Sequence, residues 1–193
     1  MRNKAITLGG LAALLVLIQL INMLLGGRLA QFGIHPRDMG SAYSILTAPL
    51  IHGDWAHLGN NLLALLPLAA LSMADGLRRF AIVSAIILLL GGALVWFLGR
   101  HALHIGASGW IFGMWSYVIA RGWFEREARA ILLSLLVLLV YGSMIWGVLP
   151  TDARISFESH LFGALAGIVA AFVVRRHRPE VAPPTSNAPK FWA

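Results

Sequence analysis

The sequence contains no cysteine, and only 12% of its 193 residues are charged, about half the share of an average soluble domain. The absence of cysteine excludes disulfide scaffolds, cysteine nucleophiles and thiolate metal sites. Apolar side chains make up 59% of the chain, and its mean hydropathy is +0.77. A soluble fold of this size cannot bury so much apolar surface, so we expect lipid to surround most of the chain.

The charges that are present are mostly basic: 15 Lys and Arg residues against 8 Asp and Glu give a net charge of +7. In a soluble protein, such a balance can indicate nucleic-acid binding. Here the cationic residues lie in short clusters between apolar runs, which is typical of topology signals in membrane proteins. We therefore expect membrane lipids, and no nucleic acid, as binding partners.

Six apolar runs approach the roughly 20 residues that a transmembrane helix needs. They cover about 5–26, 57–75, 80–99, 107–123, 129–149 and 157–174. The first follows two basic residues, as a signal peptide does, but its apolar core is longer and no small-residue cleavage site follows. The sequence therefore predicts an all-α polytopic membrane protein with one six-helix domain over 1–178. The proline-rich segment 179–193 is expected to be a disordered cytoplasmic tail.

The basic residues also predict the orientation, because cytoplasmic loops of membrane proteins are enriched in Lys and Arg. If the N-terminus is cytoplasmic, eleven of the 15 fall on the inner side: Arg2, Lys4, Arg78, Arg79, Arg121, Arg126, Arg129, Arg175, Arg176, Arg178 and Lys190. The outer side then holds Arg28, Arg37, Arg100 and Arg154. We therefore expect both termini in the cytoplasm. The long outer loop 27–56 is expected to form its own structure at the bilayer surface.

Three predicted spans that run in the same direction carry polar residues near their outer ends. His57 and Asn61 lie in the second span, Ser108 in the fourth and His160 in the sixth. At 1.5 Å per residue, all four lie within about two helical turns of the outer surface. Because polar groups are costly inside a membrane, this coincidence predicts a functional site.

Ser108 lies between Gly106 and Gly109, which leave room around its hydroxyl for a tetrahedral adduct. If a helix begins here, the unpaired backbone N–H groups of its first turn can stabilise an oxyanion. The alternative is that the motif only permits close helix packing. His57 and Asn61 share a helix face and both donate hydrogen bonds, which suits the same oxyanion site. They can also be simply a polar helix start.

His160 shares its helix face with Gly163 and Gly167, and such a small-residue face permits a close helix contact. That contact would bring the imidazole to a serine, for which it is the usual general base. The alternative is an ordinary interfacial histidine. No acidic side chain stands out as a third catalytic member, so a two-residue Ser–His mechanism is the simpler hypothesis.

Three motifs, taken in order, resemble the rhomboid family of intramembrane serine proteases. They are His52-x4-His57-x3-Asn61, Gly106-x-Ser108-Gly109 and His160-x2-Gly163-x3-Gly167. The resemblance implies that Ser108 is the nucleophile and His160 the general base. It also implies an oxyanion hole made by the Ser108 N–H and the side chains of His57 and Asn61. The fifth span and the loop 150–156 would form a mobile gate.

The sequence departs from the family pattern at two places. Tyr43-Ser44 stands where many members have Trp-Arg, and Phe112 stands where a tyrosine often stacks on the histidine. Phenylalanine can stack in the same way but has no hydroxyl. Neither change removes a reacting group.

The resulting expectation is an intramembrane serine endopeptidase that needs no cofactor or metal. It would cut single-pass membrane proteins near the outer face of a bacterial inner membrane. A non-catalytic relative that binds transmembrane helices is the alternative, although such proteins typically lack the serine or the histidine. A transporter would need polar residues through the whole membrane depth, whereas the inner halves of these spans are nearly all apolar. A zinc protease would need a motif such as H-E-x-x-H, which is absent. The oligomeric state is not predicted.

Overall fold

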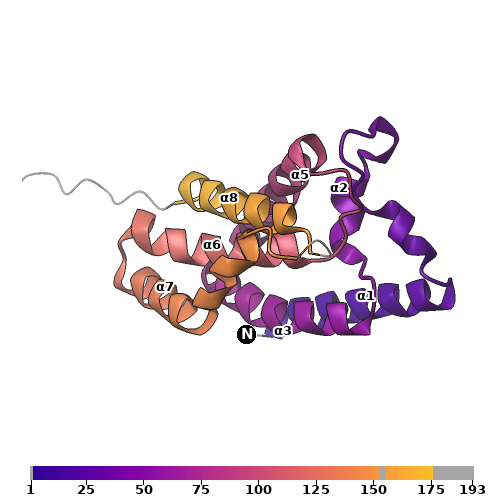
Figure 1. Ribbon diagram of the computed structural model, residues 1–193. Coiled ribbons are helices and arrows are strands. Elements are labelled where there is room, and N and C mark those ends of the chain that lie inside the picture. Colours follow the sequence, from indigo (N-terminus) through magenta and orange to yellow (C-terminus); the bar gives the residue numbers. More distant parts are fainter. Residues whose placement is uncertain (1, 153–154, 176–193) are drawn as a thin grey trace, which may run out of the picture.

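The computed structural model describes residues 2–152 and 155–175, which form a bundle of helices (Figure 1). The tail expected over 179–193 lies outside the described residues. The longer helices are α1 (Arg2–Leu24), α3 (Trp55–Ser72), α4 (Leu77–Ile86), α5 (Gly92–Leu98), α6 (Ser108–Glu125), α7 (Ala128–Tyr141) and α8 (Phe157–Val173). Short turns extend three of them: η4 (Met73–Asp75) follows α3, the π-helical η5 (Ile87–Gly91) joins α4 to α5, and η6 (Gly142–Val148) continues α7.

A helix occupies each of the six predicted spans, with ends that differ from the prediction by three residues or fewer. Within the described residues, four of these helices are long and apolar enough to cross a membrane: Arg2–Leu24, Trp55–Asp75, Leu77–Leu98 and Ala128–Val148. α8 is apolar but has only 17 residues, and α6 is not among the four. The helical bundle is thus observed, while six crossings remain a prediction.

α6 lies at the centre of the bundle and contacts α3, α7, α8 and η5 (Figure 1). Because other helices bury most of its side chains, α6 does not need the apolar composition of a lipid-facing helix. The helices around it expose large apolar side chains instead, such as Leu139 on α7, which is 85% exposed. Exposure of this kind is stable only where the surrounding solvent is lipid.

Glycines bring α6 and α8 into close contact. A Cβ on Gly163 would collide with the backbone oxygen of Gly109, and a Cβ on Gly167 with that of Gly113. The small-residue face predicted for α8 thus lies where the backbones of α6 and α8 meet. Gly109 belongs to the same crossing, since a Cβ there would lie 3.1 Å from the backbone oxygen of Ser159. The glycine after Ser108 thus packs against α8, and this contact does not exclude a catalytic role for the motif.

The segment between α1 and α3 folds into short helical turns that project beside α5 (Figure 1). These turns are η1 (Arg28–Phe32), η2 (Met39–Ser41), α2 (Ser44–Thr47) and η3 (Ala48–Leu50). Arg37 donates a hydrogen bond to the backbone oxygen of Gly99 (2.8 Å). Asn22, at the end of α1, donates to that of His52 (3.1 Å). The expectation that this loop has a structure of its own is confirmed.

One expectation about the helix interiors is wrong. At the end of the bundle away from His160, α6 buries Tyr117, Arg121 and Glu125 rather than apolar side chains alone. Arg79 forms an ion pair with Glu125, and Arg121 pairs with Glu125 (2.7 Å) and with Asp75. Charges in such a place are tolerated because each cation has an anionic partner. We call these five residues the buried charge cluster.

Candidate active site

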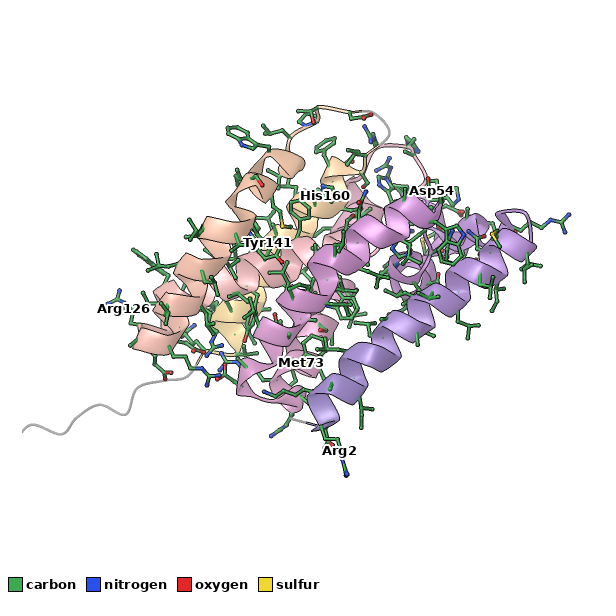
Figure 2. The ribbon with its side chains drawn as sticks, turned by 90° about the horizontal axis from the view of Figure 1, so that it is seen from below. Arg2, Asp54, Met73, Arg126, Tyr141 and His160 are labelled. Carbon is green, nitrogen blue, oxygen red and sulfur yellow. The ribbon has the colours of Figure 1, made fainter. Side chains whose placement is uncertain are left out.

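The first turns of α3, α6 and α8 meet at one end of the bundle. Figure 2 shows Asp54 and His160 toward this end, with Arg2, Met73 and Arg126 toward the opposite end. Ser108 and His160 both lie in the first turn of their helices, and His57 and Asn61 lie in the first two turns of α3. The structure therefore places the four predicted site residues at the same end of the bundle.

The start of α3 fixes the orientation of His57. Asp54 caps the helix, because its carboxylate accepts a hydrogen bond from the His57 backbone N–H at 2.7 Å. The Gly53 N–H points at His57 Nδ1 at 3.5 Å, so Nδ1 is the acceptor and Nε2 carries the proton. One turn later, the buried Asn61 donates from Nδ2 to the His57 backbone oxygen at 2.9 Å. A second amide hydrogen of Asn61 remains for another acceptor.

Gly106 places the loop before α6 against these two side chains. Its φ of +109° lies in the region that favours glycine. A Cβ at this position would lie 2.7 Å from His57 Nε2 and 3.9 Å from Asn61 Nδ2. His57 and Asn61 thus lie beside the backbone two residues before Ser108, which is where an oxyanion site would require them.

Two hydrogen bonds hold this loop in place. The Gly106 N–H donates to the backbone oxygen of Ala48 (2.9 Å), and the Ala107 N–H donates to His52 Nε2 (3.3 Å). His52 is fully buried, and this burial, reinforced by the nearby His57, lowers its pKa from 6.5 to about 4. The ring is therefore neutral at physiological pH and can accept. The sequence marked His52 only as part of a motif; the structure gives it a contact next to Ser108.

Ser108 is the first residue of α6 and is half-buried. Its backbone N–H has no partner within the helix, because the first N–H groups of an α-helix are left unpaired. Within the described residues, the Ser108 hydroxyl forms no hydrogen bond, either to His160 or to another group.

His160 is held by a ring and by a backbone oxygen. It stacks on Phe112, one turn after Ser108, with ring centres 4.1 Å apart and an interplanar angle of 7°. Its Nδ1 lies 2.8 Å from the backbone oxygen of Gly147 in η6. A carbonyl oxygen only accepts, so Nδ1 carries the proton and Nε2 keeps a lone pair. That is the tautomer that a general base next to a serine requires.

The nearby carboxylates have other partners. Asp54 caps α3, and Glu158 forms an ion pair with Arg100 (3.3 Å). The Gly147 oxygen orients the His160 ring, as an aspartate orients the histidine of a Ser–His–Asp triad. Gly147 could not be found from the sequence, because a backbone oxygen leaves no side-chain signal. Its lack of a Cβ is required here, since one would lie 2.6 Å from the Phe112 ring.

A cavity of about 40 Å³ is lined in part by the loop before Ser108 and by the first turn of α6. Gly106, Gly109, His104 and Ser159 contribute to its wall, together with apolar residues of the α4–η5–α5 helix and of the loop between α1 and α3. One water molecule needs roughly 10–15 Å³, so there is room for a few. Among the described residues, no cluster of His, Asp and Glu is arranged to hold a metal ion.

The chain is similar to known proteins over most of its length. The sequence profile of the Rhomboid domain matches residues 39–177. An uncharacterized protein of Mycobacterium tuberculosis is 40% identical over 171 residues, which cover 84% of this chain and 71% of that protein. One of Mycobacterium leprae is 36% identical over the same length, 84% of this chain and 68% of that protein.

A more distant relative has a name that specifies an activity. The Bacillus subtilis protein named "Putative rhomboid protease YdcA" is 27% identical over 146 residues, 69% of this chain and 68% of that protein. The profile covers well over half of the chain, and the three motifs of the site lie inside the matched region. This chain is therefore an integral membrane protein of the rhomboid family.

Proposed function

We propose that this protein is an intramembrane serine endopeptidase of a bacterial inner membrane. It crosses the membrane six times and has both termini in the cytoplasm. It cuts single-pass membrane proteins near the outer face of the bilayer. The observation that carries the proposal is His160, whose ring is stacked on the α6 turn after Ser108 and whose Nδ1–H is held by Gly147. Membership of the rhomboid family supports it independently.

In the proposed reaction, Ser108 Oγ attacks the scissile carbonyl carbon while His160 Nε2 takes the hydroxyl proton. The tetrahedral intermediate collapses when the imidazolium gives that proton to the leaving amine, which breaks the peptide bond. Water then attacks the acyl-enzyme and loses a proton to His160, and the imidazolium returns this proton to Ser108 Oγ as the bond between Oγ and the acid product breaks. The Gly147 oxygen keeps Nδ1 protonated throughout, so Nε2 is the atom that exchanges the proton.

Three donors stabilise the oxyanion: the Ser108 backbone N–H, the His57 Nε2–H and the free Asn61 amide hydrogen. The N-terminal end of α6 adds the positive end of its helix dipole. Because these donors are preorganised in a site of low dielectric constant, each stabilises the transition state far more than it would in water. Loss of one such donor typically lowers the rate about 100-fold or more. Gly106 allows His57 to lie close to the loop before Ser108, because a side chain at position 106 would displace His57.

The substrate must be unwound where it is cut, because an intact helix shields its carbonyl groups through backbone hydrogen bonds. Substrates with small or helix-breaking residues near the outer interface are therefore favoured. They enter past η6 and the 150–156 loop, in which residues 153–154 lie outside the described part. Because η6 also supplies the oxygen that orients His160, its position affects both entry and catalysis.

The test is cleavage of a model single-pass substrate in liposomes by the wild type, by Ser108→Ala and by Ser143→Ala. Ser143 is exposed in η6, so its variant is the matched control. We expect cleavage by the wild type and the control and none by Ser108→Ala. If all three fail on several substrates, the alternative of a helix-binding relative is favoured. If Ser108→Ala cleaves as fast as the wild type, Ser108 is not the nucleophile.

A further inference from the structure

The loop that leads to Ser108 is joined to the start of α8 by a hydrogen bond that the proposed chemistry does not use. His104, four residues before Ser108, is 2% exposed, and its Nδ1 lies 2.6 Å from Ser156 Oγ. Ser156 is the N-cap of α8 and precedes His160 by four residues. This contact therefore links the segments that carry the two proposed reacting residues.

The direction of this hydrogen bond follows from its neighbours. His104 Nε2 lies 3.2 Å from the backbone oxygen of Arg100, so Nε2 carries the proton and Nδ1 accepts from the Ser156 hydroxyl. Burial lowers the pKa of His104, which keeps the ring neutral and preserves this acceptor. Ser156 Oγ accepts in turn from the Ser159 backbone N–H (3.2 Å), which caps the helix.

Further contacts hold the segments on both sides of this hydrogen bond. The separation of His104 and Ser156 therefore affects the separation of Ser108 and His160. The His104 backbone pairs with Ile34 through two hydrogen bonds of 2.9 and 3.0 Å. A second link runs parallel to the first, because Glu158 pairs with Arg100 at 3.3 Å and is itself 5% exposed. The segment before Ser108 thus holds the first turn of α8 at two points.

We propose that His104 is a positioning residue that, through Ser156, sets the place of His160 relative to Ser108. This inference rests on the proposed protease function. A proton transfer between oxygen and nitrogen depends steeply on their separation, and a misplacement of about 1 Å can cost on the order of 100-fold in rate. A purely structural role would lower stability without a selective effect on kcat.

The experiment compares His104→Ala, His104→Asn and Ser156→Gly in liposomes with a model single-pass substrate. The side-chain oxygen of asparagine can accept in place of Nδ1, and glycine keeps most of the N-cap preference while removing the hydroxyl. We expect kcat to fall about 10- to 100-fold in His104→Ala and in Ser156→Gly with KM nearly unchanged. His104→Asn should recover most of the rate, and His104→Ala combined with Ser156→Gly should lose no more than His104→Ala alone.

The matched control is His101→Ala, because His101 is exposed three residues earlier in the same loop and should leave kcat unchanged. Equal kcat for His104→Ala and the wild type overturns the inference and leaves the protease function intact. Equal losses in the Ala and Asn variants also overturn it. If His104→Ala does not fold, Ser156→Gly and His104→Asn decide in its place. A wild type that cleaves no substrate and whose Ser108 does not react with a fluorophosphonate overturns the function and the inference together.

Discussion

At the scale of the residue, the orientation of His160 depends on neutral groups. A carboxylate next to the imidazole would have to be desolvated in the bundle, which costs several kcal/mol unless it is fully paired. The backbone oxygen of Gly147 gives the same tautomer without a buried charge, and the Phe112 ring fixes the plane of the imidazole. Phe112 therefore replaces the tyrosine of other family members as a stacking partner.

His52 gives a prediction about pH. Its pKa of about 4 in the folded protein lies below the 6.5 of an exposed histidine, so the unfolded chain binds a proton first as the pH falls. The stability contributed by neutral His52 is complete above about pH 6.5 and is lost as the pH falls toward 4, by at most about 3 kcal/mol. Thermal unfolding in detergent from pH 7 to 4 measures this loss.

The control for that measurement is His52→Gln, whose side-chain oxygen can still accept from the Ala107 N–H. This variant should lose less stability between pH 6.5 and 4 than the wild type does. Some loss will persist, because burial also lowers the pKa of His104 and acts with the same sign. Identical pH profiles for the variant and the wild type would contradict the assignment to His52.

At the scale of the element, the crossing of α6 and α8 determines whether the site assembles. The two helices carry Ser108 and His160 in their first turns, and their glycines let the backbones touch just below these residues. The separation of the two helices thus depends on these glycines, because they have no side chains to keep the backbones apart. The motif His160-x2-Gly163-x3-Gly167 contains both the proposed general base and the glycines that pack its helix against α6.

Gly163→Ala tests this crossing. Its Cβ would collide with the Gly109 backbone, which cannot move aside as a flexible side chain can, so the helices must separate. We expect unfolding to become easier by about 1–3 kcal/mol and cleavage to fall with it. Gly9→Ala on α1 is the control, since nothing lies within 4 Å of its Cβ and alanine favours a helix. Equal stability of the two variants would show that the crossing tolerates a methyl group.

At the scale of the whole molecule, the two ends of the bundle have different polar chemistry. The end with His160 gathers buried histidines, serines and an asparagine around the helix starts, together with the ion pair of Glu158 with Arg100. The opposite end holds the buried charge cluster, in which Glu125 lies between Arg79 and Arg121. This cluster connects η4, α4 and α6 at the end of the bundle where the proposed chemistry does not occur.

Glu125→Gln should therefore affect stability more than chemistry. Removing one partner from a buried ion pair leaves uncompensated charge, which typically costs about 3–5 kcal/mol. We expect a large drop in the unfolding midpoint in detergent, with kcat of the remaining folded protein close to that of the wild type. Glu127→Gln, at a half-buried position, should cost about 1 kcal/mol or less. An unchanged midpoint for Glu125→Gln would show that the cluster does not stabilise the bundle.

The family, the approximate bounds of the six helices and the candidate residues Ser108, His160, His57 and Asn61 could all be predicted from the amino-acid sequence. Hydropathy is a property of contiguous residues, so apolar runs predict helices without knowledge of their neighbours. Helical spacing likewise placed His160 on one face with Gly163 and Gly167, as the structure has it.

The groups that surround the candidate site residues became apparent from the folded chain and not from its sequence. The Gly147 oxygen reaches His160 across 13 residues, His104 reaches Ser156 across 52, and His52 reaches Ala107 across 55. The buried charge cluster likewise joins α6 to η4 and α4. Such pairs have no local pattern, because a hydrogen bond depends on how the chain returns in space and not on its neighbours in sequence. For that reason, the sequence could name the proposed reacting groups but not the groups that orient them.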